Sequence, residues 1–343
     1  MLKFGWDAMT LFYSTILLLS ILPFPSKHNN MTQIDQKFMT QALKLARLGG
    51  RAVAPNPMVG AVIVKGGKVI GKGYHQKFGG PHAEVNAIYS VKNKADLHGS
   101  TIYVTLEPCR HQGKTPPCWN LIQSVGIVRV VCGSVDPWHG KDSEERGAKS
   151  VEQKKLTAHR SPLFAFSKGK IAKECRELNK FFFTSVEKKR PYITVKIAMS
   201  ADGFVAGENG QAVHFTTKSQ DQRVHELRAQ HQAIMVGSNT VLLDNPHLGV
   251  RHVPGQDPLR IILDSKKRVA KTAQVFRDKN FLHVQKKIPL KTLFKQLAKK
   301  GIASVLVEPG PTLYQIFKRD GLIDELIVLK GKKKLGKGLK VDL

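Results

Sequence analysis

Short apolar runs alternate with amphipathic helical segments along most of the chain, and this alternation constrains the fold more than any other feature. A helix is expected within residues 31–50, where apolar residues recur at helical spacing. They are Phe38, Met39, Ala42, Leu43 and Ala46. Two apolar runs flank Gly66-Gly67 and predict a β-hairpin. Further helices are expected in 82–93 and 116–126, and further strands in 100–108 and 127–136. Strands that alternate with helices predict a layered α/β domain.

The alternation divides the chain into two domains, which suits its 343 residues. The first α/β domain is expected over 31–150. A polar linker with one helix, around "IAKECRELNKFFF", is expected over 151–189. A second strand-rich pattern begins near residue 190, so another α/β domain is expected over 190–343.

Residues 1–30 stand outside this pattern. "MTLFYSTILLLSILPFP" is an apolar run of 17 residues, whereas a membrane-spanning helix needs about 20. No small-residue cleavage site of a signal peptide follows it. The folded protein is therefore expected to start near Met31, after a leader that is dispensable or a misassigned start. A membrane anchor is the alternative.

The formal net charge of +29 favours contact with an anionic partner, such as nucleic acid, a membrane surface or a phosphorylated small molecule. The lysines are spread along the chain, which indicates a solvated basic surface rather than a nucleic-acid footprint. The chain has only four cysteines, too few for a secreted disulfide framework. Free thiols and a cytoplasmic location are expected.

Two short motifs predict a metal site. "PHAEVNAI" opens a predicted helix with His82, and "EPCRHQGKTPPC" carries Cys109 and Cys118 with eight residues between them. A catalytic zinc ion takes three protein ligands and leaves a position for water. His82, Cys109 and Cys118 supply an imidazole and two thiolates, and Glu84 follows closely enough to move protons beside the water. The alternatives are buried thiols without a metal, or a structural zinc site.

A structural zinc site would need a fourth protein ligand, and Glu84 would then have no catalytic role. The candidates for that ligand are Cys132, His75 and His111. The joint order of His-Ala-Glu, strand, Glu-Pro-Cys and Pro-Cys favours one catalytic Zn²⁺ per chain.

The first domain resembles the deaminase half of the bacterial bifunctional riboflavin-biosynthesis deaminase–reductase family. The resemblance rests on "PNPMVGAVIV", "PHAEVNA", "YVTLEPC" and "GKTPPC". Most nucleoside and nucleic-acid deaminases of the superfamily have only two residues between the cysteines, so the long loop points to the riboflavin family. The resemblance implies a three-layer, cytidine-deaminase-like fold and deamination of a diaminopyrimidinone with a ribosyl phosphate. It implies substrate contacts by Asn56, His111 and Lys114. Arg110 stands where the family has a small residue.

The second domain resembles the reductase half of the same family, which has a dihydrofolate-reductase-like fold. The resemblance rests on "KIAMSADGFVA", "LRAQHQAIMVGSNTVLLDNPHL", "RIILDS", "VEPGPTLYQIF" and "GLIDELIV". It implies NADPH-dependent reduction of a ribosyl to a ribityl chain. By this resemblance the substrate residues are Arg228, Leu248, Arg251 and Glu308. The cofactor residues are Ala198, His214, Thr240, Asp244 and Gly310.

Several positions depart from the family pattern. His214 stands near an expected aromatic residue and Ala212 near an expected serine. Pro309 replaces a glycine or alanine and removes a backbone donor from a loop expected to meet phosphate. "DPWHGKDSEERGAK" lacks the usual glycine-and-valine pattern, and the chain is expected to lack a final strand or two of the reductase.

The sequence therefore predicts a bifunctional enzyme of riboflavin synthesis that uses Zn²⁺ and NADPH on phosphorylated pyrimidine substrates. A homodimer is expected from the resemblance, and no nucleic-acid partner or stable membrane association is expected. A tRNA deaminase is the alternative that the charge supports. A deaminase with a catalytically degenerate second domain is another.

Overall fold

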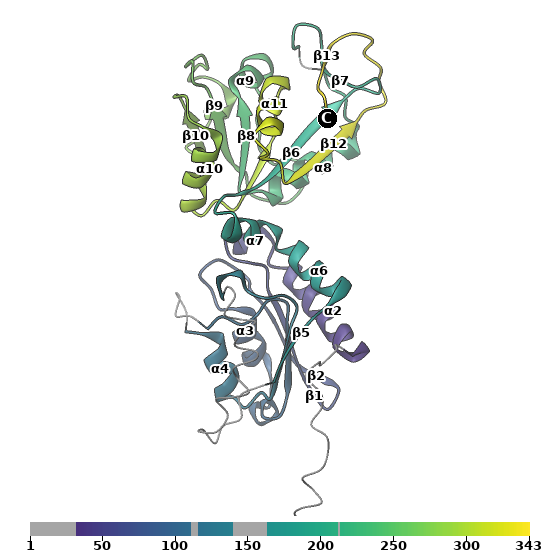
Figure 1. The fold of residues 1–343 in the computed structure, drawn as a ribbon, viewed down its shortest axis with the longest axis vertical. Coiled ribbons are helices and arrows are strands. Elements are labelled where there is room, and N and C mark those ends of the chain that lie inside the picture. The colour runs from purple at the N-terminus through teal and green to yellow at the C-terminus, as the bar shows by residue number, and fades with distance from the viewer. Residues whose placement is uncertain (1–31, 111–115, 140–162, 212) are drawn as a thin grey trace, which may run out of the picture.

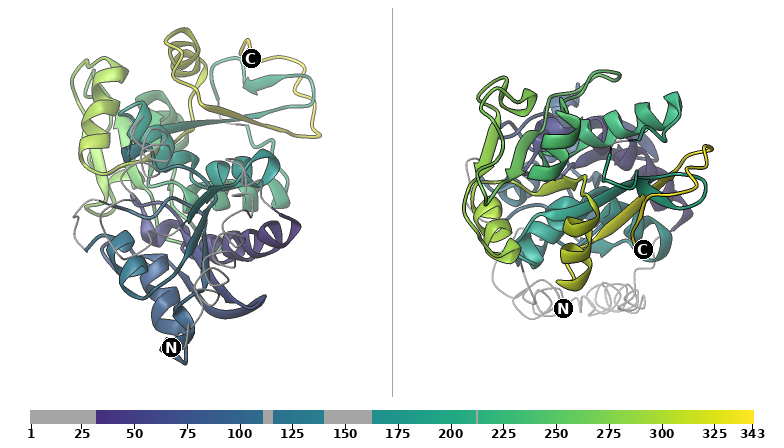
Figure 2. Two further views of the ribbon diagram at one scale, coloured as in Figure 1. Left: turned by 60° about the horizontal axis from the view of Figure 1, so that its bottom comes forward. Right: turned by 90° about the horizontal axis from the view of Figure 1, so that it is seen from above.

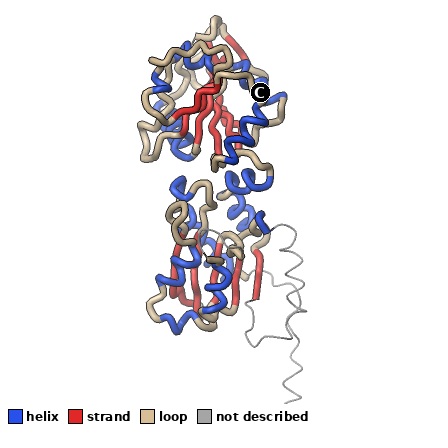
Figure 3. Tube along the Cα trace, turned by 90° about the vertical axis from the view of Figure 1, so that its left-hand side faces the viewer, coloured by secondary structure: helices blue, strands red, loops and turns tan. Residues whose placement is uncertain are grey.

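The structure, a computed structural model, describes residues 32–110, 116–139, 163–211 and 213–343, which form two lobes joined near α7 (Figure 1). Seen from the side, each lobe holds its strands among helices (Figure 3). No helix in the described ranges combines the length and apolar character that a membrane crossing requires.

The first lobe contains a five-stranded sheet in the order β2-β1-β3-β4-β5. The pairs of β1 with β2 and with β3 are antiparallel, whereas β3, β4 and β5 run parallel. The strands are β1 (Gly60–Lys65), β2 (Lys68–Tyr74), β3 (Thr101–Val104), β4 (Arg129–Cys132) and β5 (Leu163–Phe166). The predicted hairpin is confirmed, because Gly66 and Gly67 adopt positive φ angles in the turn between β1 and β2.

Helices cover both faces of this sheet and give three layers. They are α2 (Gln33–Arg47), α3 (Ala83–Ser90), α4 (Cys118–Ser124), α6 (Gly169–Leu178) and α7 (Lys180–Glu187). Side chains of β1 alternate between two buried clusters: Ala61 and Ile63 pack with α3 and α4, and Val62 and Val64 pack with α2 and α6. All five apolar residues predicted to form one face of α2 are buried. The predicted cytidine-deaminase-like three-layer architecture is thus confirmed.

The predicted linker is wrong for residues 163–187. Strand β5 pairs with β4 in the first sheet, and two helices follow it instead of one. Cys175 of α6 and Phe183 of α7 are buried against the first domain. The aromatic segment 163–166 is only four residues long and follows a polar stretch, so periodicity could not distinguish it from a loop.

The second lobe contains a six-stranded sheet in the order β10-β9-β8-β11-β6-β12, and every neighbouring pair is parallel. The strands are β6 (Tyr192–Met199), β8 (Ala233–Gly237), β9 (Leu259–Leu263), β10 (Phe281–Val284), β11 (Ser304–Val307) and β12 (Glu325–Lys330). Helices α10 (Leu290–Lys299) and α11 (Pro311–Arg319) share one buried cluster with the sheet, and α8 (Lys218–Gln230) and α9 (Ser238–Asp244) share another.

Short elements complete the described chain. Strands β7 (Phe204–Ala206) and β13 (Leu339–Lys340) form an antiparallel pair on the β12 side of the large sheet (Figures 1 and 2). Four 3₁₀ turns are described, namely η1 (Gly50–Val53), η2 (Lys94–Leu97), η3 (Pro137–His139) and η4 (Gln274–Phe276). The dihydrofolate-reductase-like fold predicted for the second domain is confirmed.

Candidate active site

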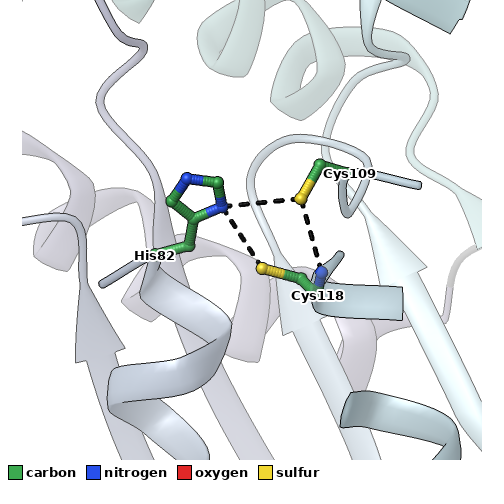
Figure 4. A group of neighbouring side chains, drawn as sticks. All are labelled: His82, Cys109 and Cys118. Carbon is green, nitrogen blue, oxygen red and sulfur yellow. Dashed lines mark hydrogen bonds between the residues drawn. The ribbon is translucent and has the colours of Figure 1, made fainter. Parts of the chain in front are cut away.

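The three predicted metal ligands converge at the carboxyl end of β3. His82 is the N-cap residue of α3, Cys118 opens α4, and Cys109 lies in the loop after β3. The Nδ1 atom of His82 lies 3.6 Å from Sγ of Cys109 and 3.3 Å from Sγ of Cys118 (Figure 4). All three ligand atoms lie within 4.8 Å of one another. A tetrahedral zinc site, with Zn–S of about 2.3 Å and Zn–N of about 2.0 Å, needs ligand atoms about 3.5 Å apart, so the donor set fits Zn²⁺.

The two thiols differ in acidity because they share a proton. The Cys118 thiol and the His82 ring both hydrogen-bond to Cys109, and together they outweigh burial and lower the pKa of Cys109 to about 4. The backbone N–H of Cys118 also donates to Sγ of Cys109 over 3.4 Å. The pKa of Cys118 is raised because this thiol keeps its proton toward Cys109 and is buried. The pair therefore presents one ready thiolate, and a bound cation would displace the second proton.

Two of the three predicted alternatives for a fourth ligand, Cys132 and His75, do not join this group. Within the described residues, the group of close donors consists of His82, Cys109 and Cys118. Cys132 lies in β4 and is buried, and His75 makes other hydrogen bonds. His111 and Lys114 lie outside the described residues. Three converging donors favour a site with an open coordination position over a closed structural site.

Glu84 lies on the first turn of α3, two residues after His82, and its side chain is buried. Burial disfavours the ionised carboxylate and raises the pKa of Glu84 from 4.5 to about 7, although the neighbouring His82 opposes this shift. A cavity of about 260 Å³ is lined by Glu84 together with His82, Cys109 and Asn56. The cavity thus brings three kinds of predicted residue together: metal ligands, proton shuttle and substrate contact.

Asn56 is oriented by His75, a residue whose role the sequence did not reveal. The Nδ1 atom of His75 lies 3.0 Å from the carbonyl oxygen of Pro81, which can only accept, so Nδ1 carries the proton. Burial lowers the pKa of His75, so the ring is neutral and its Nε2 accepts from Nδ2 of Asn56 at 3.3 Å. The amide of Asn56 therefore has a defined orientation, with its oxygen left for another partner.

The sequence also did not predict that an aromatic side chain, Trp138, lies at the cavity. Trp138 lines the cavity, is 66% exposed, and follows the Asp-Pro where the family pattern ends. The backbone N–H of Trp138 donates to the Asp136 carboxylate, and the N–H of Asp136 donates to Glu107. That chain of contacts fixes the turn η3 to the loop that carries Cys109. The sequence departs from the family pattern at "DPW", and this departure could have identified Trp138 as a residue of the site.

In the second domain, the predicted substrate residues Arg228 and Glu308 form a two-point ion pair. Nε and Nη2 of Arg228 donate to the two carboxylate oxygens of Glu308 at 2.9 and 3.1 Å. Lys196 of β6 was not predicted from the sequence to be a site residue, and its Nζ lies 3.1 Å from the same carboxylate. Burial alone would raise the pKa of Glu308, but Arg228 and Lys196 outweigh it and hold that pKa well below its usual range. A lysine within the apolar run "YITVKIAM" was the available signal.

The other two predicted substrate residues differ in exposure. Leu248 has a left-handed backbone with φ of 55°, which is uncommon for a residue with a branched side chain. Its side chain is buried in the cluster beneath α8 and α9, so its backbone is the part that remains available to a ligand. Arg251 is exposed, and its backbone N–H donates to Nδ1 of His225.

Two predicted cofactor residues meet across neighbouring strands. Gly310 is the N-cap residue of α11 after β11, and Thr240 lies in α9 after β8. A Cβ atom on Gly310 would have the Thr240 hydroxyl, 4.0 Å away, as its one neighbour within 4 Å. The carboxyl ends of adjacent parallel strands, next to a helix N-terminus, are where open α/β sheets bind nucleotides. This open backbone fits a dinucleotide such as NADPH.

The remaining cofactor predictions have weaker geometric support. Ala198 is half-buried in β6, and Asp244 is exposed at the end of α9. His214 is exposed, and its Nε2 lies 3.2 Å from the Asp221 carboxylate. Ala212 lies outside the described residues. Pro309 and Pro311 remove two N–H donors, while the N–H of Glu308 is used by the carbonyl of Met235.

Comparison with known families and proteins agrees with this geometry. Residues 32–134 match the cytidine and deoxycytidylate deaminase zinc-binding region, and residues 191–341 match the RibD C-terminal domain. The chain is 38% identical to the riboflavin biosynthesis protein RibD of Aquifex aeolicus, with 90% of each chain covered. It is 37% identical to that of Escherichia coli, over 88% of this chain and 89% of the relative.

Solved structures give the same result over both domains. A diaminohydroxyphosphoribosylaminopyrimidine deaminase/5-amino-6-(5-phosphoribosylamino)uracil reductase of Thermotoga maritima superposes with a TM-score of 0.77 at 36% identity, covering 90% of this chain and 89% of that one. RibD of Acinetobacter baumannii superposes with a TM-score of 0.77 at 32% identity, covering 90% of both chains. The chain therefore belongs to the RibD family of riboflavin biosynthesis proteins, with a zinc-binding deaminase domain followed by a RibD C-terminal reductase domain.

Proposed function

We propose that the first domain deaminates a diaminopyrimidinone that carries a ribosyl phosphate, and that the second domain reduces the ribosyl chain of the product to a ribityl chain with NADPH. Family membership supports both steps of riboflavin synthesis. The single observation that supports the first step best is the convergence of His82, Cys109 and Cys118 beside the buried carboxylate of Glu84 on one cavity.

In the first domain, His82, Cys109 and Cys118 would hold Zn²⁺. When bound, zinc lowers the pKa of a water molecule and makes water a usable nucleophile at neutral pH. Glu84 takes one proton from the attacking water on a carboxylate oxygen and delivers it to the ring nitrogen. It then takes the second proton from the hydroxyl group of the adduct and delivers it to the amino group, which leaves as ammonia. A pKa of about 7 suits this exchange, because the same group must accept and release a proton near neutral pH.

Substrate binding at this site is assigned to three residues. The amide of Asn56, oriented by neutral His75, would pair with the polar edge of the pyrimidinone. His111 and Lys114, in the loop between the two cysteines, would neutralise the phosphate. These assignments rest on the family resemblance, and for Asn56 also on its place in the cavity wall.

In the second domain, Arg228, Arg251, Glu308 and the backbone of Leu248 would bind the phosphorylated intermediate. Gly310, Thr240, Ala198, Asp244 and His214 would line the cofactor site. When bound, NADPH supplies the hydride for the reduction. The residues of the chain orient the sugar and exclude water, and a guanidinium suits the phosphate because it donates two parallel hydrogen bonds. The two hydrogen bonds to the Glu308 carboxylate hold the guanidinium of Arg228 in one orientation.

The first step is tested with Glu84→Gln, measured as ammonia release from the phosphoribosylated diaminopyrimidinone. We expect this variant to keep its zinc and to lose about 10²–10⁴-fold in deamination rate. Cys109→Ser should lose both zinc and deamination. A Glu84→Gln enzyme that works near the parental rate would exclude Glu84 as the proton shuttle.

The second step is tested with Gly310→Ala. The backbone φ of −74° and the free space at this position make alanine compatible with the fold. We expect unchanged thermal unfolding and at least tenfold weaker NADPH binding by titration, because the added methyl group would occupy the space next to Thr240. Parental NADPH affinity would place the cofactor elsewhere. A parent protein that binds no NADPH would instead indicate a degenerate second domain.

Assembly and location are part of the proposal. A homodimer is supported by the edge strand β12, whose Leu326 and Val328 are exposed. Light scattering after gel filtration would test it, and a monomeric mass at micromolar concentration would contradict it. A cytoplasmic location is supported by four cysteines that form no disulfide, and cell fractionation would test it.

A further inference from the structure

Arg51 links the two domains by hydrogen bonds from its guanidinium. It lies in η1 of the first domain and is half-buried. Nη1 donates to the backbone carbonyl of Gln256 at 2.6 Å, and Nη2 donates to that of Asp257 at 3.2 Å. Two hydrogen bonds from one rigid, charged fork fix direction as well as distance. The two acceptors lie in a segment that is neither helix nor strand.

On its own side, Arg51 is continuous with the substrate-contact turn of the first domain. The N–H of Ala54 donates to the carbonyl of Arg51 at 3.0 Å, and the N–H of Asn56 donates to the carbonyl of Val53 at 2.9 Å. Asn56 is therefore built directly on the 3₁₀ turn that carries Arg51. A displacement of this turn would move the Asn56 amide relative to the cavity.

On the other side, Asp257 is tied to the substrate loop of the second domain. Its Oδ1 atom accepts the backbone N–H of Val250 at 2.8 Å. The adjacent carbonyl of Gly249 accepts a hydrogen bond from Nη1 of Arg228 at 3.3 Å, and Arg228 is the residue paired with Glu308. The contacts therefore run without interruption from Arg51 to the loop that contains Leu248 and Arg251.

The domains are also held together by contacts that do not involve Arg51. Lys180 of α7 pairs with Glu325 at 3.2 Å, and Lys188 pairs with Asp324 at 2.7 Å; both carboxylates belong to the second domain. The ring of Phe181 packs on His231 with centroids 5.0 Å apart. The guanidinium of Arg51 is therefore not needed to keep the domains together, so its specific contribution lies in the two turns that it joins.

We propose that Arg51 is a positioning residue for both active sites: it holds the Asn56 turn of the deaminase and the 248–257 loop of the reductase in register with each other. The proposal rests on the proposed function, because the proposed function assigns a substrate contact to each of these two segments. Removing the guanidinium frees an irregular loop on one side and a short 3₁₀ turn on the other. Substrate binding then has to order both.

The test uses the full-length zinc-loaded protein and measures the two reactions separately. Deamination is followed as ammonia release, and reduction as NADPH oxidation with the purified deaminated intermediate. Arg51→Met keeps the apolar stem and removes the donors, while Arg51→Lys keeps the charge without the fork. Arg47→Ala is the matched control, because it removes an exposed arginine of α2 four residues upstream.

We expect Arg51→Met to raise KM about tenfold in both reactions, as for the loss of a charge-assisted hydrogen bond, with little change in kcat, zinc content or thermal unfolding. Arg51→Lys should recover part of both effects, and Arg47→Ala should match the parent. Parental KM values in Arg51→Met, or a change in one reaction alone, would overturn the proposal. A fall in kcat, zinc content and thermal stability together would overturn it as well, because that pattern reports general unfolding. A parent without either activity would refute the proposed function instead.

Discussion

Burial of the Glu84 carboxyl should make the stability of the zinc-free protein depend on pH in a predictable way. The pKa of Glu84 is raised by burial from 4.5 to about 7. Between these values the folded protein keeps a proton that the unfolded chain has released, so raising the pH favours unfolding. The stabilising contribution is fully present below pH 4.5 and is lost as the pH rises through about 7. At about 1.4 kcal/mol for each pH unit, the loss amounts to roughly 3 kcal/mol.

Glu84→Gln isolates this contribution, because glutamine cannot ionise and the other titrating groups remain. Urea unfolding of both proteins in the presence of a chelator, at pH 4.5 and pH 8, should give free energies that diverge. Relative to the parent, the variant should gain roughly 3 kcal/mol between the two pH values. Tryptophan fluorescence follows the first domain, because Trp6, Trp119 and Trp138 all precede the second.

The control for this experiment is Glu177→Gln, which removes a carboxylate of α6 in the first lobe that is 70% exposed. Its unfolding curve should follow the parent at both pH values. Parallel pH profiles for the parent and Glu84→Gln would refute the reasoning, since they would mean that Glu84 titrates alike in the folded and unfolded chains. The buried carboxyl would then lack the neutral-range pKa on which its role as proton shuttle depends.

Three further perturbations follow from the contacts. Cys118→Ser should lose zinc, measured by metal analysis, yet bind NADPH with parental affinity in a titration. Arg228→Met leaves Lys196 as the cation paired with Glu308 and should cost about 3 kcal/mol in urea unfolding; a cost under 1 kcal/mol would show that the pair is not effectively buried. Asn179 is buried, and its amide both donates to and accepts from the backbone of Met58. Asn179→Ala should therefore lower the unfolding free energy by about 2 kcal/mol, and an unchanged urea midpoint would contradict this.

The zinc site could be predicted from the sequence because its donors are locally encoded. His82 and Cys118 each lie at the start of a helix and directly follow a proline, which favours a helix start. Cys109 ends the motif "YVTLEPC", in which a strand leads into a loop. The order of helix, strand, loop and helix around them brings the three donors to one edge of the sheet. The hairpin and the face of α2 were predictable for the same reason, since periodicity and a Gly-Gly turn are properties of neighbouring residues.

Contacts that depend on topology could not be obtained in this way. Asn179 meets Met58 across 121 positions of sequence, and Arg51 meets Gln256 across 205. No local pattern marks such pairs. From the sequence alone, Lys196 would be assigned to the exposed face of its strand. Its role becomes visible only from the structure, where Glu308 lies at the end of the neighbouring strand β11. Strand β5 was not predicted, because four residues after a polar stretch are too few to show the alternation of side chains that marks a strand.

The departures from the family pattern have unequal physical weight. Pro309 removes an N–H from the loop before α11, but Gly310 still offers an open backbone position beside Thr240. His214 is exposed and paired with Asp221, so it can be replaced with little effect on the core. The Arg228–Glu308–Lys196 group is different, because its side chains are only 11–13% exposed and a largely buried carboxylate is destabilised when one of its two cations is removed. The presence of this costly group is a stronger argument for a working reductase domain than the surface substitutions are against it.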